Sequence, residues 1–358
     1  MPFSLKQNEQ DARERLRAFW AGSSLGRPAL HVVADNPAYT ERPWRGIELD
    51  AKGRDVLPEW HAWRAANTLA GTLYLAEAMP AAVAVWGGYL TTVATLAGGD
   101  YTYHSDSAWV RPIPGLWERP LPAFDPEHPT AKCYELILRR MAEVVGRNGF
   151  VNPPVLLDGL TTLSQFRTPE QLCHDLAECP EHVQRWSGAL TRLGLDAYEH
   201  DYRILKSLGY GDATTWLGAM AEGRMESVQC DFAVMLSPAM FDQFVMPDLR
   251  RATEYFDFSM YHLDGTGQMR FLDLLRTLPK LNGIQWNPEP PAGSPALWIE
   301  AFREIRKRGF CLHIHCPTVD EAVAITKALG PDGLLLVCNR FKTVAEAEAA
   351  IRRIEGSC

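Results

Sequence analysis

The residues best suited to chemistry in this sequence lie at the ends of short apolar runs. His262 and Asp264 close the segment SMYHLD and are followed by the turn sequence GTG. Because alternate residues of a strand share a face, these two side chains are expected to point the same way. Imidazole, carboxylate and thiolate groups all bind zinc, and three protein ligands plus an open position are typical of catalytic zinc. With Cys338, near the end of GLLLVCN, they form a candidate metal set.

Other polar side chains close further strand candidates. Gln229 and Asp231 end the VQCD run, Asp158 ends PVLLD, and His313 and His315 are two apart in FCLHIHC. We expect Asp231 and His315 to orient substrate or transfer protons, since a general base must reach its proton directly or through one water. Gln229, Asp158 and His313 are expected to contact substrate. The alternatives are a helix N-cap for Asp158 and a buried histidine bonded to backbone for His313.

Tryptophan gives a separate hypothesis. Trp86, Trp109 and Trp286 lie near predicted strand ends, where they could form an aromatic cage for a methylated ammonium. Trp286 is therefore also a candidate substrate contact. Ordinary packing in the core or at the surface is the alternative for each of the three.

The C-terminal hundred residues alternate between strand and helix. The sequence predicts four strands, each followed by a helix, at 259–264, 281–288, 310–316 and 333–339. Ser294 with Pro295 marks one helix start, and Thr318/Glu321 and Thr343/Glu346 have capping-box spacing. Four such units in a row indicate parallel strands joined by crossover helices.

The N-terminal part gives a similar but less regular pattern. Strands are expected at 26–35, 81–88, 153–160 and 226–236, and helices at 60–78, 133–146 and 168–205. Roughly eight strand–helix units without a linker favour a single domain over 1–358, an α/β (β/α)₈ TIM barrel with an N-terminal helical extension over 1–25. An open doubly wound sheet is the alternative, but no GxGxxG follows an early strand. In a barrel, the candidate residues would meet at the carboxyl ends of the strands.

Composition excludes several classes of partner. The 358 residues carry a formal net charge of −8, which disfavours a nucleic-acid partner. No run of eighteen apolar residues suggests a membrane span, and the first residues do not read as a secretory signal. The eight cysteines are scattered without a CxxC pair, so we expect reduced thiols and a cytoplasmic location.

Six stretches together resemble the uroporphyrinogen decarboxylase-like superfamily, from about Leu16 to the C-terminus. They are GRPAL, TLAGGDYTYHSDSAWVRPI, TPEQLCHDLAECPEHV, GRMESVQCDFAVMLSPAMFDQFVMP, MYHLDGTGQMRFLDLL and VCNRFKTVAEAEAAI. The resemblance implies a (β/α)₈ barrel that is either a decarboxylase or a zinc-dependent methyltransferase working with a corrinoid protein.

The resemblance is nearer to the methyltransferases. The arginine-rich segment by which the decarboxylases grip propionates is missing from HVVADNPAYTERP. The methyltransferases bind zinc through His-x-Cys and a distant cysteine; His262 and Cys338 match this pattern, and Asp264 departs from it. A carboxylate still binds zinc but is a harder ligand than a thiolate.

The expected function is therefore zinc-dependent transfer of a methyl group from a corrinoid protein or small donor to a thiol-type acceptor. Zinc would be held by the chain, and corrinoid would arrive on a partner. Two alternatives stay open. One is a metal-free decarboxylase or lyase that acts on a small carboxylic acid through Asp231. The other is a non-catalytic barrel that binds a small molecule.

Overall fold

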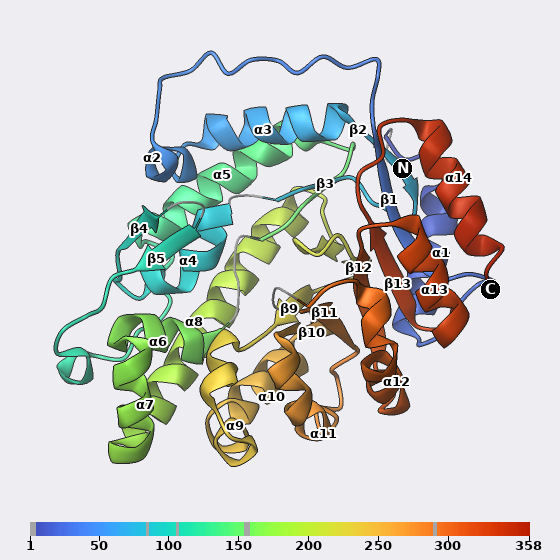
Figure 1. Ribbon diagram of the computed structural model, residues 1–358. Helices are drawn as coiled ribbons and strands as arrows, with labels where there is room; N and C mark the ends of the chain where they lie inside the picture. Colours follow the sequence, from blue (N-terminus) through green and yellow to red (C-terminus); the bar gives the residue numbers. More distant parts are fainter. Residues whose placement is uncertain (1–4, 84–85, 105–106, 154–157, 289–291) are drawn as a thin grey trace.

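The computed structural model describes residues 5–83, 86–104, 107–153, 158–288 and 292–358. At its centre is a seven-stranded sheet in the order β2–β1–β13–β12–β11–β10–β9 (Figure 1). Neighbours from β1 to β9 are parallel, and β2 runs antiparallel to β1 at one edge. Its strands are β1 (Ala29–Asp35), β2 (Thr72–Ala76), β9 (Met225–Val228), β10 (Phe258–Asp264), β11 (Gly283–Asn287), β12 (Cys311–Cys316) and β13 (Leu334–Cys338).

Six short strands form three separate pairs. They are β3 (Ala81–Ala82) with β6 (Phe150–Val151), β4 (Tyr101–His104) with β5 (Ser107–Val110), and β7 (Ala213–Thr214) with β8 (Met220–Ala221). The β3–β6 pair is parallel and the other two are antiparallel.

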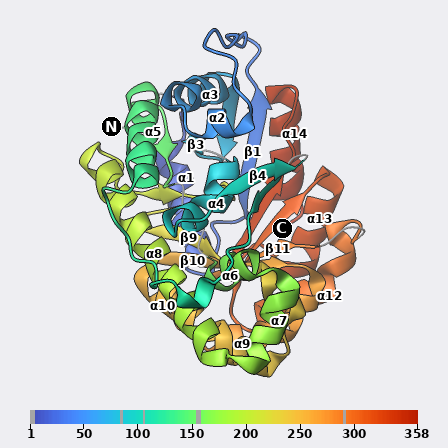
Figure 2. The ribbon, with the colours of Figure 1, turned by 90° about the vertical axis from the view of Figure 1, so that its left-hand side faces the viewer.

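Helices surround these strands (Figures 1 and 2). They are α1 (Glu9–Trp20), α2 (Ala51–Asp55), α3 (Pro58–Ala70), α4 (Trp86–Leu96), α5 (Pro129–Val145), α6 (Gly159–Arg167), α7 (Pro169–Glu178), α8 (Pro180–Ser207), α9 (Pro238–Phe244), α10 (Met246–Tyr255), α11 (Leu272–Leu275), α12 (Ile299–Lys307), α13 (Val319–Leu329) and α14 (Val344–Glu355). Within the described ranges, none is long and apolar enough to cross a membrane.

The C-terminal strand–helix predictions are confirmed. The four predicted strands correspond to β10, β11, β12 and β13, and helices α11 to α14 follow them in turn. Both capping boxes form: Thr318 and Thr343 each accept from the backbone N–H three residues on, whose glutamate reaches back. Local sequence decides these helix starts, because each box satisfies backbone groups that have no partner inside the helix.

Three N-terminal predictions are wrong in part. The helix expected over 60–78 ends at Ala70, and Thr72–Ala76 instead forms β2, where strand pairing with β1 outweighs helix propensity. The strand expected over 226–236 ends at Val228 and turns into a 3₁₀ helix, Asp231–Met235. The strand expected over 81–88 stops at Ala82, and α4 begins at Trp86. Of the strand expected over 153–160, residues 154–157 lie outside the described residues.

The α/β class is confirmed, with a mostly parallel sheet. Strands β1 and β13, from opposite ends of the chain, pair in parallel. The ladders in the described ranges leave β9 at the other edge of the sheet, with β3 and β6 paired only to each other. A closed barrel is therefore not shown by strand pairing.

The two faces of the sheet have different coverings. Leu334 and Leu336 of β13 belong to the same buried apolar cluster as Ile325 of α13 and Ile354 of α14. The alternate residue Leu335 belongs to a second cluster, with residues of α1 and of the segment that contains β7 and β8. We call these the helix face and the inner face. Strand alternation thus decides which side chains can reach a site on the inner face.

Candidate active site

Polar side chains lie side by side on the inner face of three neighbouring strands. His262 of β10 is in register with Gln285 of β11, which is in register with His313 of β12. One step nearer the carboxyl ends, Asp264 is in register with Asn287. Because parallel strands end at the same edge of a sheet, these groups converge where the sequence predicted a site.

Two of these side chains, together with Asp231, are close enough to share a metal ion. Ligand atoms of Asp231, His262 and Asp264 all lie within 4.8 Å of one another. His262 Nε2 is 3.9 Å from Asp264 Oδ1, too far for a hydrogen bond. Asp231 reaches the group from the 3₁₀ helix that follows β9. The structure thus brings two of the three predicted metal residues together and adds Asp231, which was expected to be catalytic.

Gln285 determines which ring nitrogen of His262 carries the proton and which has a lone pair for a metal. Its amide nitrogen donates to Trp286 O at 3.1 Å, so its oxygen faces His262 Nδ1 and accepts a hydrogen bond from it. His262 therefore carries its proton on Nδ1 and presents the Nε2 lone pair toward Asp264. Burial also lowers the pKa of His262, although Gln285 and Asp264 oppose the shift. A neutral imidazole held in this way is the form that binds a metal.

The two carboxylates are oriented by neighbouring amides. Asn287 Nδ2 donates to Asp264 Oδ1 at 2.6 Å, and Gln229 Nε2 donates to Asp231 Oδ1 at 2.8 Å. One oxygen of each carboxylate is thereby engaged. Gln229 Oε1 is buried without a hydrogen-bond partner in the part of the chain that the structure describes. Gln229 therefore retains an acceptor beside the carboxylates.

Asp158 is hydrogen-bonded to the backbone of Asp231. It caps α6 by accepting from Thr161 N at 3.0 Å, and its other oxygen accepts from Asp231 N at 2.9 Å. Burial raises the pKa of Asp158 to about 6. Burial also raises the pKa of Asp231 well above its usual value, and the charges of Asp158 and Asp264 add to the shift. The N-cap alternative for Asp158 is confirmed; its predicted contact with substrate stays a prediction.

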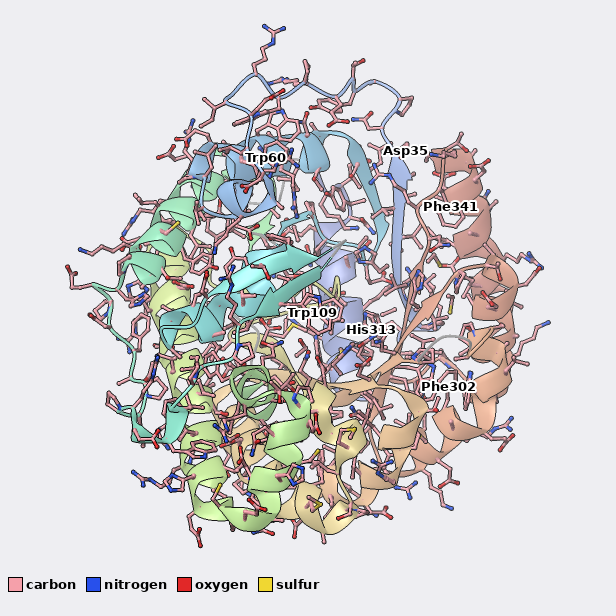
Figure 3. The ribbon with its side chains drawn as sticks, turned by 60° about the vertical axis from the view of Figure 1, so that its left-hand side comes forward. Asp35, Trp60, Trp109, Phe302, His313 and Phe341 are labelled. Atoms are coloured by element: carbon pink, nitrogen blue, oxygen red, sulfur yellow. The ribbon has the colours of Figure 1, made fainter. Side chains whose placement is uncertain are left out.

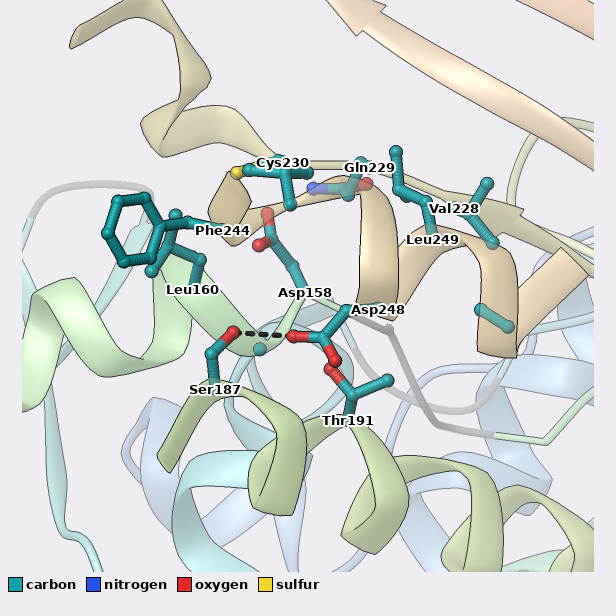
Figure 4. Close-up of a pocket in the computed structure, with 13 residues that line it drawn as sticks. Asp158, Leu160, Ser187, Thr191, Val228, Gln229, Cys230, Phe244, Asp248 and Leu249 are labelled. Carbon is teal, nitrogen blue, oxygen red and sulfur yellow. Dashed lines mark hydrogen bonds between the residues drawn. The ribbon is translucent and has the colours of Figure 1, made fainter. Parts of the chain in front are cut away.

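A small cavity lies behind these carboxyl groups (Figure 4). Asp158 and Gln229 line it together with Ser187 and Asp248, which are joined by a hydrogen bond of 2.7 Å. Its volume of about 20 Å³ is enough for roughly one water molecule. The cavity is too small to hold a substrate.

His313 and His31 hold a loop against the inner face. His313 Nε2 donates to Leu217 O at 2.9 Å, and His31 Nδ1 donates to Gly218 O at 3.0 Å. Both carbonyls belong to the β7–β8 connection, which places the Trp216 ring 5.2 Å from that of His262. The alternative of a buried histidine bonded to backbone is thus confirmed for His313. Its predicted contact with substrate stays a prediction.

His315 is the exposed member of β12 on the inner face. Its Nε2 makes a 2.8 Å hydrogen bond with Asn339 Oδ1, and Asn339 Nδ2 donates to Pro317 O at 3.1 Å. The second bond fixes the orientation of the amide, so Nε2 of His315 is the donor. Its Nδ1 makes no hydrogen bond to any described residue, which leaves a lone pair able to accept a proton.

Cys338 and Trp286 lie on the other side of the sheet. Cys338 is 5% exposed and shares the helix-face cluster with Leu334 and Leu336 of its own strand. Trp286 is 2% exposed and packs on Phe302 of α12, which lies among the C-terminal helices in Figure 3. The expectation that Cys338 lies with His262 and Asp264 is wrong, as is a Trp286 pointing into the site. Strand alternation places both away from the inner face.

The proposed tryptophan cage is not assembled by the described residues. Trp109 of β5 is 59% exposed, Trp286 is buried under α12, and the Trp86 side chain lies outside the described residues. Sequence reasoning missed Gln285, Asn287, Trp216 and Asn339. For Gln285 and Asn287 a signal existed: they alternate with Trp286 in GIQWN, at the spacing that singled out His262 and Asp264.

Comparisons with known proteins add a fold-level likeness. No family model matches the chain, and no curated protein matches it. Among solved structures, the chain is similar to a methyltransferase from Methanosarcina mazei, with a TM-score of 0.61 and 16% identity over 96% of this chain and 98% of the other. At that identity the likeness shows the fold alone, an α/β fold shared over nearly the whole chain.

Proposed function

We propose that this protein is a metal-dependent methyltransferase whose metal is held by Asp231, His262 and Asp264. The observation that carries the proposal is the grouping of these ligand atoms within 4.8 Å on the inner face. The likeness to a methyltransferase over 96% of the chain supports methyl transfer as the reaction class.

The donor set suits a divalent cation. With Asp231 deprotonated, the two carboxylates and a neutral imidazole would carry two negative charges to an ion, and each side chain is oriented by an amide of Gln229, Gln285 or Asn287. Zinc is our first candidate, because it accepts nitrogen and oxygen ligands with an open position. When bound, such an ion supplies Lewis acidity that lowers the pKa of a thiol or water.

The remaining roles fall to the chain's own residues. We propose that His315 accepts the proton of a small thiol acceptor at Nδ1, while Asn339 holds its ring through Nε2. The acceptor sulfur, freed of that proton, would form the bond to the methyl carbon as the bond from carbon to its donor breaks. The donor would be a corrinoid protein or a small methylated molecule. Trp216 would help to exclude water beside His262.

Finer aspects of the fold belong to the same proposal. We propose that the strands close into a (β/α)₈ barrel of the uroporphyrinogen decarboxylase-like kind. The parallel pairing of β1 with β13 brings strands from the two ends of the chain together. The parallel pair β3 and β6 would supply the remaining strands of the barrel wall. A cytoplasmic location and the absence of a nucleic-acid partner remain predictions from composition.

Elemental analysis of purified protein tests the metal site. We expect near-stoichiometric zinc in the wild type, and loss of most of it in Asp231→Asn and His262→Ala. Cys338→Ala is the matched control, because its sulfur lies on the helix face and its removal should leave the metal content unchanged.

Two results would overturn this assignment. If zinc is lost in Cys338→Ala but kept in Asp231→Asn, the ligands are those predicted from the sequence, with Cys338 in place of Asp231. A metal-free wild type that still transfers methyl groups would exclude the metal altogether.

A metal-free lyase or decarboxylase is a second candidate, favoured by the contact between buried Asp158 and half-buried Asp231. Such a pair could hold a proton and deliver it to a carbanion formed as a small carboxylic acid loses CO₂. In that case Asp231→Asn would abolish turnover, whereas His262→Ala would leave it largely intact. Equal loss in both variants would exclude this reaction.

A further inference from the structure

A second pocket lies at the carboxyl end of β1, away from the carboxylates of the candidate site. It measures about 480 Å³ and is bounded by residues 35–41, by one face of α3, and by Arg340 after β13 (Asp35 is labelled in Figure 3). The α3 residues that line it are Trp63, Arg64, Asn67 and Thr68, a spacing that places them on adjacent turns of one helical face.

Most polar groups of this pocket are already paired. Arg340 donates to Thr72 Oγ1 at 3.0 Å and to Gly71 O at 2.6 Å, and it also forms an ion pair with Asp35. Lys342 adds a second cation to Asp35, 3.3 Å away. The negative charge of Asp35 is therefore neutralised by Arg340 in the pocket wall and by Lys342.

The side-chain amide of Asn67 is also engaged. Its nitrogen donates to Arg42 O and Trp63 O, each at 3.2 Å, and its oxygen accepts from the Tyr39 hydroxyl. These bonds tie the loop after β1 to α3 and give the pocket a fixed wall. They leave little capacity in Asn67 for a ligand.

Arg64 is the exception. It is partly buried, and its guanidinium makes neither a hydrogen bond nor an ion pair within the described ranges. Burial lowers the pKa of Arg64, and the Asp55 carboxylate offsets this only through a longer-range attraction. Asp55 is itself occupied by the hydroxyls of Tyr101 and Tyr103. No acceptor among the described residues bonds to the five N–H donors of Arg64, so an anionic ligand in the pocket can supply one.

We propose that this pocket binds the anionic group of a small molecule, a carboxylate, sulfonate or phosphate, through Arg64. A planar guanidinium matches the oxygens of all three groups. Strand β1 is parallel to β10 across the sheet, so the pocket opens at the same edge as Asp264. A ligand anchored there would extend along the rim of the candidate active site. The proposal concerns binding and holds whether or not the reaction is methyl transfer.

Calorimetric titration tests the pocket, with inorganic phosphate, acetate and methanesulfonate as separate probes. We expect saturable binding of at least one probe to wild-type protein, and the preferred probe identifies the acid group. Arg64→Gln should weaken it by roughly tenfold or more, the loss expected for hydrogen bonds to a charged partner. Arg45→Gln is the matched control, because Arg45 is exposed and does not line the pocket.

Glu41 supplies a test that keeps Arg64 intact. It is an exposed carboxylate that lines the pocket and would repel an anion. Glu41→Gln should tighten binding by about twofold or more. Absence of saturable binding to the wild type, or equal affinities in wild type, Arg64→Gln and Glu41→Gln, would overturn the proposal.

Discussion

The proton of His262 is placed by an amide side chain. Gln285 is held by its bond to Trp286 O, and it accepts from Nδ1 of His262. Such partners matter because they fix the tautomer and the ring orientation of a metal-binding histidine. Local spacing places each residue on one face of its strand but does not show that the two side chains bond to each other, since they lie 23 positions apart.

Replacement of Gln285 measures this contribution. Gln285→Leu should weaken zinc binding by roughly 10- to 100-fold while the ligands remain present, because His262 loses the acceptor for its Nδ1 proton. Competition with a chelator would report the change. Trp286→Phe is the control, because this neighbour faces α12 and should leave zinc affinity unchanged. If the Gln285→Leu protein binds zinc with wild-type affinity, the hydrogen bond from His262 to Gln285 does not contribute to zinc binding.

At the scale of elements, the connection between β7 and β8 depends on two neutral histidines. Burial lowers the pKa of both His31 and His313 from 6.5 to about 4. The unfolded chain therefore binds more protons than the folded one between these values. Their contribution to stability is complete above pH 6.5 and is lost as the pH falls toward 4.

A single substitution isolates the contribution of His313. His313→Gln keeps a donor for Leu217 O but cannot titrate, so it should reduce the loss of unfolding free energy between pH 6.5 and pH 4. Urea unfolding at a series of pH values would measure the slope. His174→Gln, at an exposed position of α7, should retain the wild-type slope. If the unfolding free energy has the same pH dependence in all three proteins, protonation of His313 does not contribute to it.

For the molecule as a whole, one buried ion pair joins segments from both ends of the chain. Arg27, just before β1, donates to both oxygens of Glu77 after β2, and its Nε donates to Glu355 at the end of α14. Glu77 also accepts from Leu30 N at 2.8 Å. The side chains of Arg27 and Glu77 are 8% and 1% exposed, so loss of the Glu77 charge leaves a buried Arg27 with only its bond to the partly exposed Glu355.

Glu77→Gln should therefore cost about 3 kcal/mol of unfolding free energy. Glu222→Gln provides the comparison, because its ion pair with Arg17 is largely exposed, and its loss should cost less than about 1 kcal/mol. Denaturant unfolding of the two variants would measure the difference. Equal costs would show that the buried pair contributes no more than a surface one.

The sequence by itself determined the order of strands and helices in the last hundred residues. Each strand there is an apolar run, and the last two helices start at capping boxes, those of Thr318 and Thr343. The same local order predicted that His262 and Asp264 share a face, because alternation along one strand needs no knowledge of the rest of the chain. In the N-terminal half, Thr72–Ala76 shows the opposite case, since a segment that continues a helical pattern becomes a strand by pairing with β1.

Only the tertiary structure decided which distant residues join that pair. Cys338 matched by residue type, yet its position in the alternation of β13 turns its sulfur toward the helices. Asp231 reaches the group because the strand before it ends at Val228 and the chain turns into a 3₁₀ helix. Register between strands is determined by the packing of whole elements. The sequence therefore predicted the type of site, but which distant residue completes it depended on the tertiary structure.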